Sequence, residues 1–204
     1  MSAAKPRGSA LREACLREAL AIIGENGVEA LSLREVARRL GVSHQAPYKH
    51  FASRDHILAD IIARAFEDFA AFLDERPAGG DAMEDGANMG RAYLAYARAH
   101  PLQYRLMFGG PVPDPSQHPA MMARAQHAFG LLRASLARRR PDADDASVDL
   151  DALFVWASVH GIATILQSPS IATLQLPATT LAAAETHVLS RIKDAFKGSH
   201  HDPA

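Results

Sequence analysis

Two short helical segments joined by a tight turn constrain the fold of this 204-residue chain more than any other feature. The run Ser32-Leu-Arg-Glu35 is a capping-box pattern, which predicts a helix that begins at Ser32 and ends at Gly41. Ser43 then begins another short helix, to about Phe51. Because helices of about two turns are hardly stable alone, both must pack on a third helix, which the apolar spacing predicts at residues 9–25.

This arrangement predicts a helix-turn-helix, whose second short helix enters the major groove of DNA. Its predicted core combines apolar residues of the three helices: Leu16, Ala19, Leu20, Ile23, Leu33, Val36, Ala37, Leu40, Val42, Tyr48 and Phe51. From spacing alone, a polar helical hairpin without a nucleic-acid role remains a second interpretation. Residues 1–60 have only a small excess of basic over acidic side chains, which permits DNA binding without demonstrating it.

Polar side chains of the second short helix suit the reading of DNA. Gln45 can pair with the major-groove edge of adenine, and Ala46 can contact a thymine methyl group. Lys49 and Arg54 are placed to bind phosphate oxygens. Pro47 lies near the fourth helical position, where its missing N–H costs little. The candidate DNA-binding residues are Ser32, Arg34, Ser43, His44, Gln45, Ala46, Tyr48, Lys49, His50 and Arg54.

Residues 9–62 resemble the N-terminal domain of the tetracycline-repressor (TetR) family of bacterial regulators. The resemblance is carried by Gly27, the run Leu33-Arg-Glu-Val-Ala-Arg-Arg-Leu-Gly-Val-Ser43, Tyr48-Lys-His-Phe51, Ser53-Arg-Asp55 and Leu58. It implies a homodimeric repressor that binds a palindromic double-stranded DNA operator. Pro47 departs from the aliphatic residue usual there and leaves the base contacts open, whereas Arg54 replaces the commoner lysine and keeps its positive charge.

The remaining chain is also predicted to be helical, because no region alternates as a strand does. Helices are expected at residues 53–75, 82–99, 101–108, 119–139, 148–167 and 180–197. The fold class is therefore all-α, with about nine helices. Residues 1–62 form the predicted helix-turn-helix domain and residues 63–204 a ligand-binding and dimerisation domain, with the helix at 53–75 linking the two.

Aromatic, methionine and histidine side chains concentrate on helices of the second domain, as a small-molecule pocket requires. Any one of these side chains, taken alone, can instead be a residue of the hydrophobic core that lines no pocket. The candidate ligand-binding residues are Phe69, Tyr93, Tyr96, Tyr104, Met107, Phe108, Met122, His127, Trp156 and His160. The stretches 93–108 and 156–161 resemble a C-terminal subfamily named for its Trp-His-Gly signature. We expect an apolar or aromatic effector that changes the tilt of the helix at 53–75.

The last two predicted helices carry apolar or small residues at three- and four-residue spacing. Two such helices from each subunit would make a four-helix dimer interface. The alternative is that these two helices only complete the hydrophobic core of a monomer. The candidate interface residues are Leu153, Phe154, Ala157, Gly161, Thr164, Leu189, Ile192 and Phe196.

Several classes of protein are disfavoured by the sequence. It lacks nucleotide-binding, hydrolase and zinc-protease motifs, so we expect no cofactor, no metal and no enzyme activity. No apolar run reaches the ~18–20 residues of a membrane span, and residues 1–8 do not resemble a signal peptide, so we expect a cytoplasmic protein.

The single cysteine, Cys15, is expected in the core. The rivals are a small-molecule binding protein that has lost sequence-specific DNA binding, and a helical enzyme using His127 or His160.

Overall fold

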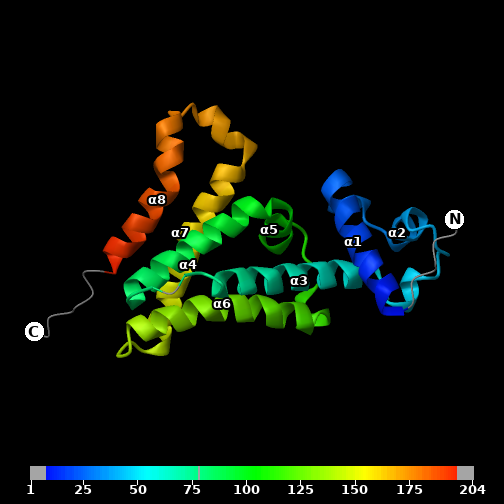
Figure 1. Ribbon diagram of the computed structural model, residues 1–204, viewed down its shortest axis with the longest axis horizontal. Coiled ribbons are helices and arrows are strands. Elements are labelled where there is room, and N and C mark those ends of the chain that lie inside the picture. Colours follow the sequence, from blue (N-terminus) through cyan, green and yellow to red (C-terminus); the bar gives the residue numbers. More distant parts are fainter. Residues whose placement is uncertain (1–7, 78, 197–204) are drawn as a thin grey trace, which may run out of the picture. The chain divides into compact units, whose positions relative to one another are not determined.

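The structure, a computed structural model, describes residues 8–77 and 79–196. Every regular element in these residues is helical, so the predicted all-α fold class is confirmed (Figure 1). Expectations for residues 1–7 and for residue 197 lie outside the described residues. The elements are α1 (Gly8–Asn26), η1 (Val28–Ala30), α2 (Leu33–Arg39), η2 (Pro47–Lys49), α3 (Arg54–Asp74), α4 (Ala82–Ala99), α5 (Pro101–Phe108), η3 (Pro115–Gln117), α6 (Pro119–Arg139), α7 (Asp145–Gln167), η4 (Pro169–Leu174) and α8 (Ala178–Ala195), where η denotes a 3₁₀ helix.

The chain divides into two compact units. The first consists of residues 1–68 and 102–126, and the second of residues 69–101 and 127–204. Helices α3 and α6 therefore each contribute residues to both units. The domain boundary predicted between residues 62 and 63 stays a prediction.

The core of the first unit contains the apolar faces of α1 and α2. Cys15, Ala19, Val36 and Ala37 have no exposed surface, and apolar residues at the start of α3 are also buried. The expectation for Cys15 is thus confirmed, and burial raises the pKa of its thiol. Tyr48 was expected in this core but is 50% exposed, so that prediction is wrong.

Glycines with positive φ separate the short helices. Gly41 has φ 63°, and its N–H bonds the carbonyl of Arg38 while the N–H of Val42 bonds that of Ala37. These two bonds form a Schellman motif, which ends α2 at a residue that glycine occupies without strain. Gly27 has φ 83° and ψ 168°, so it takes an extended conformation with positive φ and not a left-handed helical one.

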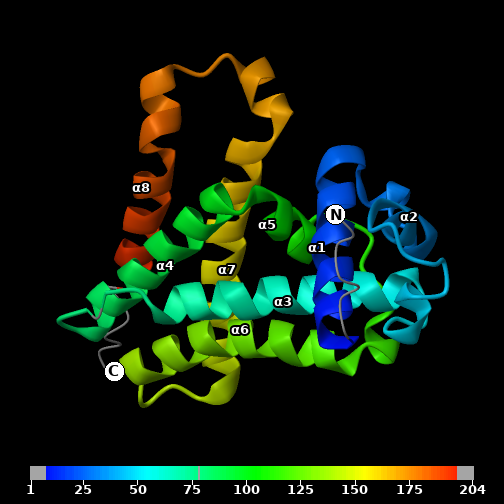
Figure 2. The same cartoon turned by 45° about the vertical axis from the view of Figure 1, so that its right-hand side comes forward.

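Helices α7 and α8 of the second unit run side by side and are joined through η4 (Figures 1 and 2). The carboxylate of Asp144 accepts a hydrogen bond of 2.7 Å from the N–H of Ser147. This cap lets α7 begin at Asp145, three residues before the predicted start at residue 148. None of the residues of Ala178–Ala195 is buried, and α8 packs against both α7 and α4.

The outer face of α7 is unusually apolar. Within the described residues, α7 is the one helix long and apolar enough to cross a membrane, although a single such helix is weak evidence for a span. Leu150, Leu153, Phe154 and Ile165 are 47–68% exposed, while Val148, Ala152, Val159 and Ala163 are buried. The exposed face is typical of a surface that contacts another protein.

Candidate nucleic-acid interface

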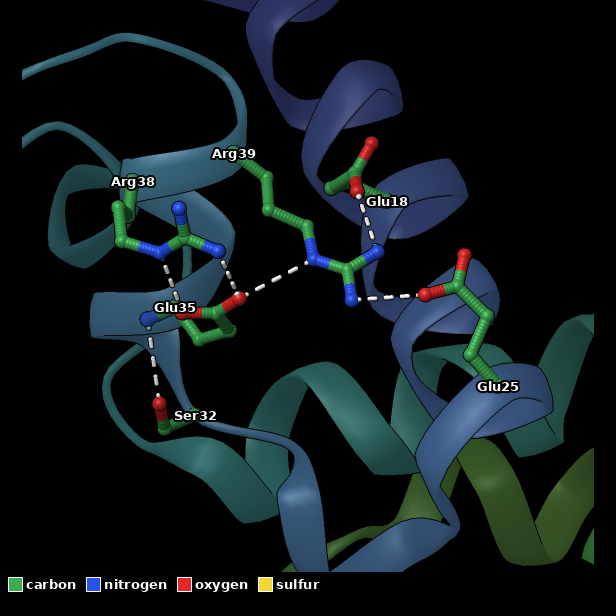
Figure 3. Close-up of polar contacts among 6 residues, drawn as sticks. All are labelled: Glu18, Glu25, Ser32, Glu35, Arg38 and Arg39. Atoms are coloured by element: carbon green, nitrogen blue, oxygen red, sulfur yellow. Dashed lines mark hydrogen bonds and ion pairs between the residues drawn. The ribbon is translucent and has the colours of Figure 1, made fainter.

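Arg39 of α2 binds three carboxylates, two of which lie on α1 and so connect the two helices (Figure 3). Its Nη2 atom lies 2.8 Å from Glu25 and its Nη1 atom 3.3 Å from Glu18, both on α1. Its Nε atom lies 3.1 Å from Glu35 on α2. Glu18 and Glu25 stand two helical turns apart, so one guanidinium with several donors can bind both. This network was not predicted from the sequence, where the seven-residue spacing of Glu18 and Glu25 was the available signal.

Glu35 joins the cap of α2 to the same network. Its backbone N–H donates to the hydroxyl oxygen of Ser32 at 3.1 Å, which confirms the predicted start of the helix. Its carboxylate accepts bonds of 2.7 and 2.8 Å from Arg38 and one from Arg39. These bonds, first from Arg38 and then from Arg39, lower the pKa of Glu35 from 4.5 to about 2. The carboxylate therefore stays charged at neutral pH.

The segment after Gly41 is not the α-helix that was predicted from Ser43 to Phe51. It consists of turns followed by the 3₁₀ helix η2, with N–H groups bonded three residues back at Ala46, Lys49 and His50. Pro47 explains the difference, because it has no N–H to bond the carbonyl of Ser43. Pro47 is also buried, so it and Phe51 anchor the segment.

Most of the candidate DNA-binding side chains are exposed. Ser43, His44, Gln45, Tyr48 and Lys49 lie together on the turn and on η2. Arg34 is exposed on the first turn of α2, whereas Ser32, Ala46, His50 and Arg54 are partly buried. The structure therefore places five exposed polar side chains on one short segment, on either side of partly buried Ala46 and buried Pro47.

Arg54 makes intramolecular contacts that the sequence did not indicate. Its Nε donates to the carbonyl oxygen of Leu31 at 3.1 Å and its Nη2 to that of Val28 at 2.9 Å. Its Nη1 lies 3.2 Å from the carboxylate of Asp55. Arg54 therefore holds the start of α3 against the connection between α1 and α2.

The candidate ligand-binding residues are divided between the two units. Tyr104, Met107, Phe108 and Met122 belong to the first, where the rings of Tyr104 and Phe108 lie 5.1 Å apart. The other six belong to the second: Phe69, Tyr93, Tyr96, His127, Trp156 and His160. His127 is exposed on α6 and stands apart from the buried aromatic residues.

His160 connects aromatic residues of α4 and α7 within the second unit. Its Nδ1 lies 3.2 Å from the hydroxyl oxygen of Tyr93, and its ring lies 6.0 Å from that of Trp156. Burial lowers the pKa of His160, which favours the neutral ring. Phe69 packs on Tyr93 with ring centroids 5.2 Å apart. These residues form an aromatic cluster with two polar groups.

The comparisons with known proteins agree with this arrangement. The profile of "Bacterial regulatory proteins, tetR family" matches residues 16–61, and that of "Tetracyclin repressor-like, C-terminal domain" matches residues 87–190. The chain is 33% identical over 94 residues to the HTH-type transcriptional regulator Rv1816 of Mycobacterium tuberculosis, covering 44% of this chain and 39% of that protein. It is 29% identical over 127 residues to the HTH-type transcriptional regulator TcmR of Streptomyces glaucescens, covering 62% and 53%. The chain thus spans about half or less of these curated relatives.

A solved structure extends the similarity to nearly the whole chain. A protein with unknown function from Rhodococcus sp. RHA1 superposes with a TM-score of 0.70 at 28% identity, covering 93% of this chain and 95% of that one. The two profiles together cover the helix-turn-helix and most of the second unit. The chain has a helix-turn-helix DNA-binding domain and belongs to the TetR family of bacterial transcriptional regulators.

Proposed function

We propose that this chain is a ligand-responsive transcriptional repressor, which acts in the cytoplasm as a homodimer on a palindromic DNA operator. The observation that carries the proposal is the exposed set Ser43, His44, Gln45, Tyr48 and Lys49 on one anchored segment. Each subunit places this segment in a major groove, and the two half-sites lie about one helical turn apart, near 34–36 Å.

The exposed side chains divide into base-reading and phosphate-binding groups. Gln45 offers the paired donor and acceptor that adenine requires in the major groove. Lys49 and Tyr48 bind phosphate oxygens, which position the segment without reading sequence. The secondary contacts come from Arg34 and from the partly buried residues Ser32, Ala46, His50 and Arg54. Arg54 already uses three donor groups in bonds within the chain, so it contributes less to phosphate binding than Lys49 and Tyr48 do.

The outer face of α7 supports the proposed homodimer. Leu153, Phe154, Ala157 and Thr164 are exposed along it, and a Cβ atom added at Gly161 would meet no atom within 4 Å. An open groove of about 420 Å³ follows α7 and α8, with Phe154, Gly161 and Ile192 among its walls. Leu189 and Phe196 of the same candidate set pack inside the unit, on Gly90 and Arg139. An isologous four-helix contact would cover the exposed face.

The aromatic cluster around His160 supports a small apolar or aromatic effector. Tyr93 and His160 supply polar groups among Phe69, Tyr96 and Trp156, the composition that small-molecule sites have. An effector that favours the non-binding form by about 1–3 kcal/mol loosens DNA about 5–150-fold.

Binding to DNA upstream of its own gene tests the proposal. The purified chain should bind that intergenic DNA more tightly than scrambled DNA of equal length, with lower affinity at higher salt. The Tyr48→Ala/Lys49→Ala variant should lose most of this affinity and keep its oligomeric state, as measured by light scattering. Loss of the dimer in the same variant would contradict the separate roles of the two units.

A second candidate function is a small-molecule binding protein that has lost sequence-specific DNA binding. The observation that favours it is the 3₁₀ geometry of the segment around Pro47, where an α-helix was expected. Such a protein would bind both DNAs equally weakly and would still bind a ligand.

A further inference from the structure

Phe51 is the last residue of the segment 43–51, which we propose reads DNA and which is called the reading segment below. The side chain of Phe51 is 2% exposed, so it anchors this end of the segment in the core. The backbone N–H groups of His50 and Phe51 both donate to the carbonyl oxygen of Pro47, at 2.9 and 3.0 Å. A displacement of Phe51 would therefore also displace the exposed side chains next to Pro47.

Arg12 of α1 lies over the ring of Phe51. Its guanidinium carbon is 5.4 Å from the ring centroid, within the ~6 Å at which a cation and an aromatic face attract each other. Its Nη2 atom donates to the carboxylate of Asp60 on α3, and its Nη1 atom lies 3.7 Å from the carboxylate of Glu13. Arg12 thus connects α1, α3 and the end of the reading segment.

A second arginine joins the same two helices. Arg64 of α3 donates bonds of 2.6 and 2.5 Å to the two carboxylate oxygens of Glu13 on α1. These bonds lower the pKa of Glu13, so its carboxylate stays charged at neutral pH. The side chains of Arg12 and Arg64 are 38% and 42% exposed, which makes them similar in burial. Of the two arginines, Arg12 is the one that lies on Phe51.

We propose that Arg12 is a positioning residue for DNA binding, which holds the ring of Phe51 and with it the end of the reading segment. Asp60 takes part by fixing the guanidinium over the ring. The inference rests on the proposed function, because it assumes that residues 43–51 read DNA. Arg12 acts through Phe51 and not by a phosphate contact of its own, since two carboxylates already face its guanidinium.

The variants Arg12→Met and Arg64→Met form a matched pair for the test. Each removes one positive charge and one ion pair between α1 and α3, and only Arg12→Met removes the contact with Phe51. The probe is the sequence that the wild-type chain enriches from random double-stranded DNA. Its affinity should fall about threefold to tenfold in Arg12→Met and by less than about twofold in Arg64→Met. Thermal melting should show a similar loss of stability in both variants.

Asp60→Asn separates positioning from a direct phosphate contact of Arg12. This variant leaves the guanidinium in place but removes the carboxylate that fixes it. If Arg12 bound phosphate, its release and the loss of a negative charge would tighten DNA binding. Positioning predicts the opposite change, a fall in affinity of about twofold or more. Arg12→Met should also keep the salt dependence of the wild type, whereas loss of a phosphate contact would lower its slope by about one.

Hydrogen exchange measured by NMR tests the positioning without DNA. The amides of His50 and Phe51 should exchange about threefold to tenfold faster in Arg12→Met than in the wild type, because the end of the reading segment opens more often. Their exchange should be unchanged in Arg64→Met. A structural role of Arg12 that does not involve Phe51 would not produce this difference between the two variants.

The outcomes separate this inference from the proposed function. Failure of the wild-type chain to select any DNA sequence would contradict the proposed function. Specific wild-type binding that is unchanged in Arg12→Met, or reduced equally in Arg64→Met, would overturn the inference alone. Tighter binding by Asp60→Asn, or unchanged exchange at His50 and Phe51 in Arg12→Met, would also overturn it. If melting shows that Arg12→Met is unfolded, Asp60→Asn decides.

Discussion

The Nη2 atom of Arg54 donates a hydrogen bond of 2.9 Å to the carbonyl oxygen of Val28. Through this bond, the first residue of α3 holds the 3₁₀ turn that leads from α1 to α2. A second bond, from Nε to Leu31, fixes the guanidinium plane. A positive charge suggested a phosphate contact at this position, but the geometry gives Arg54 an additional role in positioning α2.

Replacement of Arg54 by lysine should therefore destabilise the fold although it keeps the charge. An ammonium group cannot reproduce the two bonds of the planar guanidinium. We expect a loss of about 1–2 kcal/mol, which lowers Tm by about 2–8 °C in a chain of this size. Thermal denaturation followed by circular dichroism measures the change. An unchanged Tm together with weaker DNA binding would instead assign Arg54 to phosphate contact alone.

The helices were predictable from the sequence because local signals mark them. The cap at Ser32 and the glycine at 41 set the limits of α2 in the sequence as they do in the structure. The segment after Gly41 was not predictable with the same rules, because Pro47 turns an expected α-helix into a 3₁₀ helix. Arg39 was missed for another reason, since its partners on α1 become neighbours only after folding.

Acid should weaken the attachment of α2 through Glu35. The pKa of Glu35 is lowered from 4.5 to about 2 by Arg38 and Arg39, so its stabilising contribution is complete above pH 4.5. The contribution is lost as the pH falls toward 2, where the folded-state carboxylate is protonated. The Glu35→Gln variant lacks it at every pH. The difference in Tm between wild type and Glu35→Gln should therefore be largest above pH 4.5 and shrink toward pH 2.

A control separates this effect from general acid unfolding. Glu29→Gln, at an exposed residue of η1, is the control for the general effect of removing one carboxylate. A Glu35→Gln difference that does not change between pH 6 and pH 2 would contradict the assignment of the lowered pKa to the arginine contacts.

Glycine at position 41 should be needed for its backbone conformation and not for space. Gly41 has φ 63°, yet an added Cβ would meet no atom within 4 Å. Gly41→Ala should thus cost about 1–2 kcal/mol through backbone strain alone. Gly130→Ala, at a helical position with equally open space, should stabilise the fold by about 0.5–1 kcal/mol. Urea denaturation of both variants measures the change in the free energy of unfolding. A change in the same direction in both variants would refute the explanation.

The outer face of α7 should control the oligomeric state. Leu153 is 49% exposed in one subunit, so Leu153→Glu should dissociate the dimer and leave each subunit folded. Leu174→Glu is the control, because Leu174 is 60% exposed but lies on η4. Sedimentation velocity measures the mass of each. A Leu153→Glu variant that remains dimeric would place the subunit contact on another face.

The ligand-binding residues were the least predictable part of the candidate site. Composition marks Tyr104 and Tyr93 equally well as aromatic wall residues, but the structure assigns them to different units.

Selection of binding sites from a pool of random double-stranded DNA tests whether residues 43–51 read DNA. We expect enrichment of a palindrome whose half-sites are centred about one helical turn apart. Gln45→Ala should relax the preference at one position of each half-site, and Lys49→Ala should weaken binding uniformly while lowering the salt dependence by about one counterion. Failure of the wild-type chain to enrich any sequence, or enrichment of the same palindrome by the Tyr48→Ala/Lys49→Ala variant with undiminished affinity, would contradict the claim that residues 43–51 read DNA.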